Sequence, residues 1–282
     1  MSDSLGAVLA RLSDPVVRDL AWALGSPNLL HQIPLAPANP WYLSLLSDYQ
    51  DRLFQLDAAP GILHRHCRPY RRLGQYFEAL WHFYLLDHSR FQLLAYDWQQ
   101  VVAGTTLGAF DFIVRDNLLQ RTEHWELAVK FYLITDSDAA YGGAVGMNTR
   151  DRLRHKLDHM LKRQLRLSRH PDVHERLRRL GLGPHGRRLI LKGRLYYPTG
   201  CARLLCSQGE LGRWGTTMPD TSFVAQQKLG WFTGGRQCER LGAQQAYHDG
   251  RDNWYVRVSR EWLEKTRDEK QMMEARSGVE PD

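Results

Sequence analysis

Three strand-like segments in the first half of the chain place the strongest constraint on its fold. They read FQLLAYDWQQVV (91–102), GAFDFIV (108–114) and WELAVKFYLIT (125–135), and they are rich in aromatic and β-branched residues. The connection between the last two contains turn residues and predicts an antiparallel hairpin. A helix is the competing interpretation of the third segment, because Glu126 and Lys130 would form an i,i+4 pair, but its alternating hydrophobicity favours a strand.

The second and third segments carry charged residues among apolar ones. In the second, Asp111 shares a face with Ile113, and the opposite face is formed by Phe110, Phe112 and Val114. In the third, Glu126, Ala128 and Lys130 share a face, and the hairpin brings Asp111 close to Glu126. Burial of an unpaired charge is costly, so these side chains either face water or form a site.

Helical periodicity flanks these strands on both sides. The predicted helices are 14–24, with Asp14 as N-cap, 42–56, 71–89 and 149–168. Glu78 lies beside the apolar stripe of the third helix, where most glutamates are simply solvated. Gln164 lies in or beside the stripe of the fourth, where it either points at a site or is hydrogen-bonded in the core.

Composition and glycine content suggest where the chain divides. The stretch RLGLGPHGRR (179–188) has the spacing GxGxxG, but no strand is predicted before it, so it is interpreted as a linker and not as a dinucleotide-binding loop. The predicted parts are a helical N-terminal extension at 1–62, an α/β core at 63–178, a β-rich region at 187–262 and a charged, frayed tail at 263–282.

Bulk composition is that of a soluble globular protein. The 282 residues are 43% hydrophobic and 24% charged, and no run approaches the roughly 18 apolar residues of a membrane-spanning helix. The N-terminus lacks the features of a signal peptide. The four cysteines form no CxxC pair, which predicts free, mostly buried thiols and a cytoplasmic protein without a membrane partner.

Positive charge is concentrated in one block. Residues 150–194 contain 15 Lys and Arg against 4 Asp and Glu, a net of +11, so the rest of the chain carries −4 of the total +7. Such a block indicates a polyanionic partner, with DNA expected in preference to RNA, although a solvated helix face would look the same. The expected phosphate contacts are Arg152, Lys156, Lys162, Arg163 and Arg166.

The charged strand face has a specific chemical use. Carboxylate oxygens are hard ligands that suit Mg²⁺ or Mn²⁺, and such a metal ion polarises a phosphoryl oxygen and activates water. A nearby lysine orients that water and offsets developing negative charge. Asp111, Glu126 and Lys130 therefore provide the groups for metal-assisted phosphodiester hydrolysis, next to a basic helix that would hold the phosphate backbone.

The order of these elements resembles the restriction-endonuclease-like PD-(D/E)xK superfamily. The resemblance spans about residues 70–168 and rests on a helix, a G-x-F-D strand, an E-x-x-x-K strand and a second helix, which carry Glu78, Asp111, Glu126, Lys130 and Gln164. It implies an α/β fold with an αβββαβ core, a helical N-terminal extension and a smaller β-rich C-terminal part. It further implies these five residues as the catalytic set, with Asp111 and Glu126 as the metal ligands.

Within that superfamily, the chain resembles an uncharacterised bacterial family, domain-of-unknown-function family 1853. The stretches that carry this resemblance are VRDLAWALGSPNLL, LGAFDF, HWELAVKFYL and DRLRHKLDHMLKRQL, and it is expected to reach about residue 200. The implied function is a Mg²⁺-dependent nuclease acting on DNA or RNA.

One departure from the superfamily pattern leaves the function open. The pattern places lysine two residues after the acid, where this chain has Ala128, and Lys130 lies roughly 6–7 Å further along the same strand face. The alternative is a nuclease-fold protein that binds nucleic acid or a protein partner without catalysis. In a third interpretation, the basic block binds a protein or a tRNA-like partner and the strands are ordinary core.

Two histidine motifs carry weaker signals. The sequence HRHC (64–67) has metal-ligand residue types but no second half, so a zinc site is not predicted there. His155 and His159 lie four residues apart, but HKLDH lacks the glutamate of an HExxH site, and both are assigned to the basic face.

Overall fold

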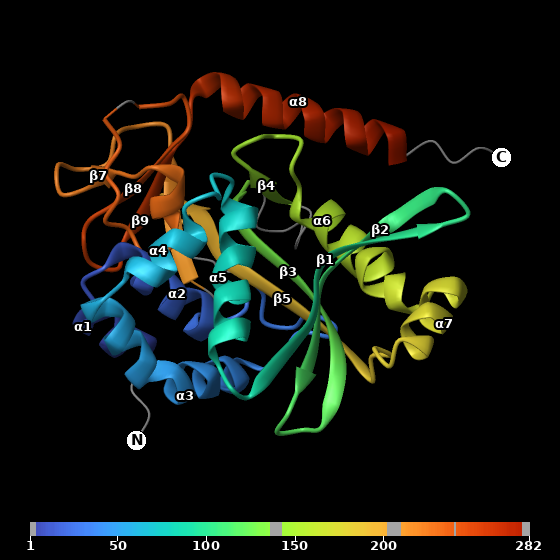
Figure 1. Ribbon diagram of the computed structural model, residues 1–282. Coiled ribbons are helices and arrows are strands. Elements are labelled where there is room, and N and C mark those ends of the chain that lie inside the picture. The colour runs from blue at the N-terminus through green and yellow to red at the C-terminus, as the bar shows by residue number, and fades with distance from the viewer. Residues whose placement is uncertain (1–3, 136–142, 202–209, 240, 278–282) are drawn as a thin grey trace. The chain divides into compact units, whose positions relative to one another are not determined.

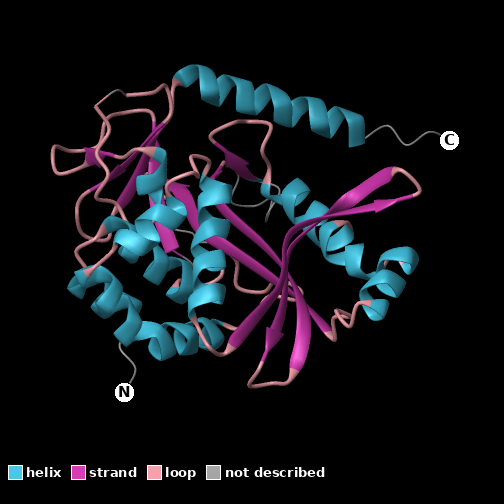
Figure 2. Cartoon of the chain, viewed as in Figure 1, coloured by secondary structure: helices cyan, strands magenta, loops and turns pink. Residues whose placement is uncertain are grey.

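The computed structural model describes residues 4–135, 143–201, 210–239 and 241–277 (Figure 1). These residues form a mixed α/β structure, with helices, strands and loops distributed as Figure 2 shows. The helices are α1 (Leu5–Arg11), α2 (Pro15–Gly25), α3 (Asn39–Ala58), α4 (Gly61–Cys67), α5 (Leu73–Asp87), α6 (Leu153–Lys162), α7 (Pro171–Arg179) and α8 (Arg260–Ser277). The strands are β1 (Phe91–Val102), β2 (Thr105–Asp116), β3 (Arg121–Ile134), β4 (Ala144–Gly146), β5 (Gly186–Pro198), β6 (Glu210–Gly215), β7 (Val224–Ala225), β8 (Gln245–His248) and β9 (Trp254–Arg257).

The strands pair in the order β1-β2-β3-β5-β6-β9-β8-β7, and β4 pairs with β3. By its internal contacts the chain divides into two compact units, Met1–Lys130 with Leu157–Gly193, and Phe131–Lys156 with Arg194–Asp282. The boundaries predicted from composition stay predictions.

The N-terminal helices of the first unit form as the sequence predicts. Asp14 caps α2, because its Oδ1 accepts hydrogen bonds from the backbone N–H groups of Val16 and Val17, and Pro15 occupies the first helical position. Helix α5 is likewise confirmed, and it buries a nearly continuous apolar face that includes Phe77, Trp81 and Tyr84. The apolar periodicity of the sequence therefore predicted these helices correctly.

The three predicted strands are confirmed as β1, β2 and β3, an antiparallel series. Residues Arg121–Ile134 form a strand that pairs with β2, which excludes the helical alternative for residues 124–133, and this strand is buried along almost its whole length. The pairing of β2 with β3 begins at Asp116 opposite Arg121 and ends at Phe112 opposite Trp125. Beyond that point β2 pairs with β1 alone, so the two strands form a fork at Asp111.

Strand β5 runs parallel to β3. At its start the backbone N–H of His185 donates to the carbonyl of Thr122 at 2.8 Å, and further along Gly193 packs against Lys130. Each of these two contacts joins residues that are 63 positions apart in the chain, so the two strands run in the same direction. A Cβ added to Gly193, whose φ is +138°, would lie 1.6 Å from the Lys130 carbonyl oxygen, so only glycine fits there.

One predicted strand face is wrong. Phe110 packs in an apolar cluster with Ile113, Leu167 and neighbouring residues, whereas Phe112 contacts Tyr96, with ring centroids 5.1 Å apart. These two phenylalanines therefore do not share one environment. Strand β1 is distorted at this level, because Asp97 has a φ of +43°, and the simple alternation assumed from the sequence is lost.

The predicted helix 149–168 is also too long. Helix α6 ends at Lys162, Arg163 leaves the helical region with φ −120° and ψ −68°, and residues Gln164–Arg169 form the 3₁₀ segment η2. No glycine or proline marks this break, so helical periodicity continued through it.

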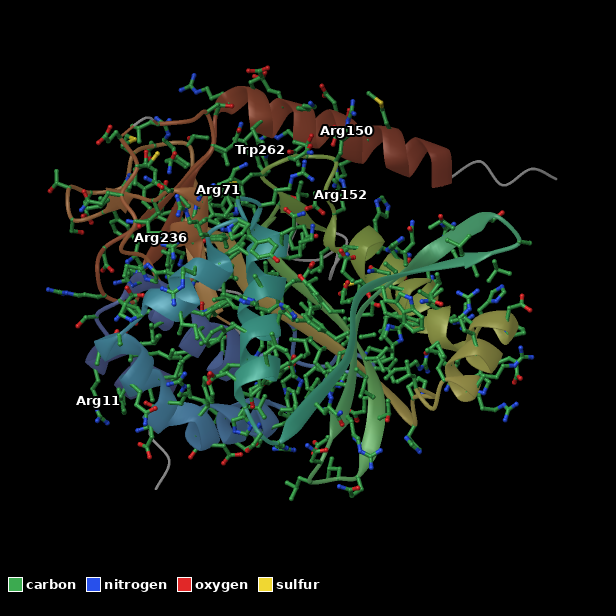
Figure 3. All side chains as sticks on the ribbon, in the orientation of Figure 1. Arg11, Arg71, Arg150, Arg152, Arg236 and Trp262 are labelled. Carbon is green, nitrogen blue, oxygen red and sulfur yellow. The ribbon has the colours of Figure 1, made fainter. Side chains whose placement is uncertain are left out.

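The second unit contains the short strands β6–β9 and helix α8. Strands β6 and β9 are parallel, and β7, β8 and β9 are successively antiparallel. The tail predicted to be frayed is helical through Ser277. Within this unit α8 is fixed by Trp262, whose Nε1 donates to the Met147 carbonyl at 2.9 Å (Figure 3).

None of the described cysteines forms a disulfide, but only Cys67 is buried, so the expectation of mostly buried thiols is wrong for Cys201 and Cys238. Cys206 lies outside the described residues. None of the described helices is both long and apolar enough to cross a membrane.

Candidate functional site

The fork between β2 and β3 is organised by Asp111. Its Oδ2 accepts a hydrogen bond from the backbone N–H of Leu127 at 2.7 Å. The ladder with β3 has ended one residue earlier at Phe112, so this carboxylate takes the place of a strand-to-strand hydrogen bond. Asp111 is half-buried, which leaves part of it at the surface of the fork.

Glu126 lies next to this fork and is fully buried. Its Oε1 lies 2.7 Å from Nε2 of His124, and its Oε2 accepts a hydrogen bond from Nε2 of Gln164 at 2.8 Å. Gln164 comes from the first residue of η2, 38 positions away in the chain. The structure therefore brings together two of the predicted residues, Glu126 and Gln164.

His124 is part of the same network. Burial and the nearby Arg187 charge lower its pKa to about 3, so the ring is neutral at pH 7. A neutral ring that donates from Nε2 to Glu126 has its lone pair on Nδ1, which lies 3.2 Å from the Ser168 hydroxyl and accepts from it. On the other side, Nδ1 of His159 lies 3.1 Å from Oε1 of Gln164. Glu126 is thereby held in one orientation by neutral polar groups.

The remaining predicted residues lie on the same elements as expected. Lys130 is half-buried on the face of β3 that also carries His124 and Glu126, and Ala128 between them is buried. Glu78 is half-buried on α5; burial is the main cause that raises the pKa of the Tyr96 hydroxyl on β1, and the charge of Glu78 adds to it.

A basic groove of about 710 Å³ lies beside this network. Its walls come from the β2 hairpin and from η2, and its lining residues are Leu107, Arg163, Arg166, Leu167, Arg169 and His170. Arg187 belongs to the same field, since burial and then the charges of Arg169 and Arg166 lower its pKa. Arg163 directly precedes Gln164, so the groove adjoins the Glu126 network.

The predicted phosphate contacts separate in the structure. Arg163 and Arg166 line the groove, whereas the exposed Lys162 pairs with Asp158 at 3.1 Å on α6. Arg152 is 8% exposed and donates to Glu269 of α8 at 3.4 Å, a contact within the second unit (Figure 3). Lys156 also belongs to that unit.

Several residues of the site were not identified from the sequence. His124 stands two residues before Glu126, so strand alternation alone places both on one face and was a usable signal. His159 was assigned to the solvated basic face, although it contacts Gln164. The positions of Ser168 and Arg169 are set by the 3₁₀ segment η2, and no residue type in the sequence predicts this segment.

The carboxylates are of a ligand type that only some metal ions prefer. Among the described residues, no group of three or more His, Cys, Asp or Glu side chains is arranged to hold a metal. Mg²⁺, however, is commonly bound by one or two carboxylates and completes its shell with water and substrate phosphate oxygens. Asp111 at the fork and Glu126 next to it carry the oxygen ligands that suit Mg²⁺ or Mn²⁺ and not those of a closed zinc centre.

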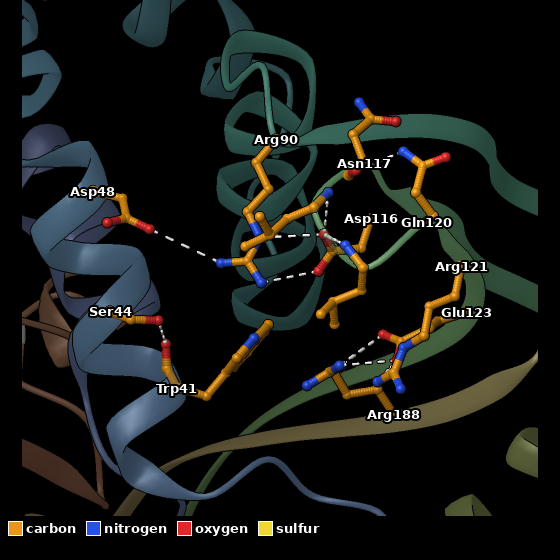
Figure 4. Close-up of polar contacts among 12 residues, drawn as sticks. Trp41, Ser44, Asp48, Arg90, Asp116, Asn117, Gln120, Arg121, Glu123 and Arg188 are labelled. Carbon is orange, nitrogen blue, oxygen red and sulfur yellow. Dashed lines mark hydrogen bonds and ion pairs between the residues drawn. The ribbon is translucent and has the colours of Figure 1, made fainter.

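A second polar cluster occupies the opposite face of β3 (Figure 4). Glu123 is 2% exposed and its two oxygens accept hydrogen bonds from the Arg188 guanidinium at 2.9 and 3.0 Å. Arg121 forms a further ion pair with Glu123, and the Arg188 guanidinium lies 4.4 Å from the centroid of the Trp41 ring. Both guanidinium groups are paired with this one carboxylate, which is the arrangement of a structural ion pair.

Comparison with curated proteins and with solved structures gave no match. A family model described as a domain of unknown function (DUF1853) matches residues 18–280, so the similarity extends well beyond residue 200, where the sequence resemblance was expected to end. Because this match covers nearly the whole chain, the protein belongs to the DUF1853 family.

Proposed function

We propose that this protein hydrolyses phosphodiester bonds in nucleic acid with Mg²⁺ or Mn²⁺, on a core of the PD-(D/E)xK type. The element order supports this assignment: α5, the antiparallel β1–β2–β3, the short β4, then α6, η2 and α7, then β5 parallel to β3. Apart from the additional β4, η2 and α7, this order is the one expected of the αβββαβ core of the superfamily.

The observation that carries the proposal is the contact between Gln164 and Glu126 beside Asp111. Gln164 of η2 donates to Glu126 of β3, and Asp111 of β2 accepts from the backbone N–H of the next residue, Leu127, which supports a common site for these residues. A merely solvated carboxylate would not be fully buried, and Glu126 is held by two hydrogen bonds to neutral groups.

Each residue has a distinct role in this proposal. Asp111 and Glu126 would hold the metal ion, which when bound polarises a phosphoryl oxygen and activates water. His124 and Gln164 fix the orientation of Glu126. Lys130, on the same strand face, would offset negative charge that develops on the phosphate. Arg163 and Arg166 would hold the substrate backbone in the groove.

A second function is favoured by a specific observation. Ala128 occupies the position of the superfamily lysine and is buried, and Glu126 is 0% exposed with each oxygen in a hydrogen bond. These features suit a protein that has kept the fold and binds nucleic acid through the basic groove without hydrolysis. DNA remains the proposed partner in preference to RNA.

Hydrolysis and binding are separated by one experiment. Purified wild-type protein is incubated with labelled single-stranded, duplex and branched DNA, and with RNA, in Mg²⁺ and in Mn²⁺. We expect cleavage that is abolished in Glu126→Gln while binding persists, because the change removes a metal ligand and no phosphate contact. Glu175→Gln, on the exposed face of α7, is the matched control and should remain active. Binding without cleavage in every mixture would select the non-catalytic function.

Salt dependence tests the groove itself. For duplex DNA the logarithm of the binding constant falls with the logarithm of salt concentration by about 0.9 per phosphate neutralised, so replacing Arg163 and Arg166 with alanine should reduce the slope by about 1.8. Arg68→Ala, an exposed arginine outside the basic block, should leave the slope unchanged. An unaltered slope in the groove variant would assign the groove to a solvated surface.

A further inference from the structure

In the fold, a histidine from another helix lies next to the HRHC motif. His66 of α4 lies beside His82 of α5, with ring centroids 5.0 Å apart and ring planes inclined by 41°. These residues are 16 positions apart on different helices, and no sequence motif connects them. Neither belongs to the Glu126 network or to the basic groove.

Both rings have a nitrogen without a partner. Nε2 of His66 and Nδ1 of His82 are buried atoms that make no hydrogen bond. A buried polar atom that lacks a partner is costly, and most buried polar atoms in folded proteins have one. Two such atoms on adjacent imidazole rings indicate a common partner between the helices.

The other groups around the rings prepare these nitrogens as ligands. The backbone of Ala79 forms a hydrogen bond with the His66 ring and favours its proton there, which leaves a lone pair on Nε2. The His82 ring is stacked on Tyr96 with centroids 4.0 Å apart, which fixes its plane. Burial lowers the pKa of both rings, and the His82 pKa falls to about 4, so both are neutral at pH 7.

We propose that His66 and His82 form a binding site for a divalent transition-metal ion of the zinc type. Imidazole nitrogens bind Zn²⁺ at about 2.0–2.1 Å, so each ring centre would lie about 3.2 Å from the ion and two tetrahedrally placed rings about 5.2 Å apart. The observed 5.0 Å agrees with this separation.

The site has two protein ligands and is completed by water. Among the described residues no third His, Cys, Asp or Glu joins the pair in a metal-binding arrangement. A site of this kind is open to exchange and binds moderately, unlike the closed four-ligand centres of structural zinc. Mg²⁺ prefers oxygen ligands, so the site is chemically distinct from the carboxylate pair at Asp111.

The test is titration of the purified protein with Zn²⁺, followed by melting temperature and by calorimetry, and with Co²⁺, followed by its visible absorption. We expect one Zn²⁺ per chain and a raised melting temperature, because only the folded state joins the two helices. Loss of one imidazole from a chelating pair should weaken binding by about a hundredfold in His66→Gln and in His82→Gln. His174→Gln, an exposed histidine on α7, is the control and should bind as wild type does.

A second measurement needs no variant and stands if either one fails to fold. Imidazole ¹⁵N spectra of the wild-type protein should show two ring nitrogens shifting on addition of Zn²⁺ and none on addition of Mg²⁺. The proposal is overturned by the absence of stoichiometric Zn²⁺ binding, or by binding that survives in both variants with unchanged affinity. Either result would assign the two nitrogens to a trapped water molecule.

Discussion

Two glutamates on strand β3, three residues apart, are both buried and yet are satisfied by opposite means. Glu123 is paired with the guanidinium groups of Arg188 and Arg121 (Figure 4). Glu126, on the other face of the strand, is held by the neutral ring of His124 and the amide of Gln164. The same residue type on one strand therefore sits in two different electrostatic environments.

The difference has consequences for function. An ion pair that is closed by aromatic rings, as Arg188 is by Trp41, neutralises its carboxylate and has no remaining charge to offer a ligand. Neutral donors orient a carboxylate without cancelling its charge, which is the condition a cation-binding carboxylate requires. On the proposed function we therefore expect Glu126 to serve chemistry and Glu123 to serve stability, and the variants below test that division.

The largest effect on stability is expected from Glu123→Gln. The change leaves the Arg188 guanidinium buried and without its charge partner, and breaking a buried ion pair in this way costs about 3–5 kcal/mol of the free energy of unfolding. Urea denaturation measures the loss. Arg121→Ala, which removes a partner whose side chain is 45% exposed, should cost less than about 1 kcal/mol. Equal losses in the two variants would contradict a buried pair between Glu123 and Arg188.

The next effect is a dependence on pH to which His124 contributes, together with the other histidines whose pKa is lowered by burial, His66, His82 and His88. The pKa of His124 is about 3 in the folded protein and ordinarily about 6.5, so below pH 6.5 the unfolded chain binds a proton that the folded chain does not. The stabilising contribution of the neutral His124 ring is fully present above pH 6.5, and the free energy of unfolding should fall by up to about 1.4 kcal/mol per pH unit for this group as the pH drops toward 3. Urea denaturation between pH 7.5 and 5.5 avoids the range in which carboxylates titrate. The slope of the free energy of unfolding against pH should become smaller in His124→Gln, and an unchanged slope would show that other groups cause the whole dependence.

Local patterns in the sequence predicted most of the first unit. Period-3.6 apolar spacing located α2, α3 and α5, and strand alternation located β1, β2 and β3. The same reasoning brought Gln164 forward as a residue that could point at a site, and it contacts Glu126. The helices and strands were located correctly for one reason, because each apolar pattern lies within a single helix or strand.

The failures depend on tertiary structure. The fork at Asp111 arises where β2 leaves β3, beside the positive φ of Asp97, and neither event has a marker such as glycine. The end of α6 depends on the backbone of Arg163, a residue type with good helix propensity. The pairing of His66 with His82 requires two helices to be packed together, so the motif HRHC alone did not reveal it.

Asp111 offers an intermediate effect that sharpens the comparison. In Asp111→Ala the Leu127 N–H loses its acceptor at the fork, which should cost about 1–3 kcal/mol. In Asp111→Asn the side-chain oxygen still accepts that hydrogen bond, so most of the stability should return while the metal response is lost. Melting temperatures with and without Mn²⁺ measure both quantities. An Asn variant with low stability and a full Mn²⁺ shift would identify Asp111 as purely structural and place any metal elsewhere.

The smallest effect on stability is expected from Glu126→Gln, the same substitution that is costly three residues earlier. An amide at position 126 would still accept a hydrogen bond through its oxygen and would donate one through its nitrogen. The neutral His124 ring can adapt by moving its proton from Nε2 to Nδ1, since the Ser168 hydroxyl at 3.2 Å can accept as well as donate. Because the hydrogen bonds with His124 and Gln164 are kept, the loss should stay below about 1 kcal/mol in urea denaturation. A loss comparable to that of Glu123→Gln would mean that the Glu126 charge itself stabilises the fold, and the division between a functional and a structural glutamate on β3 would fail.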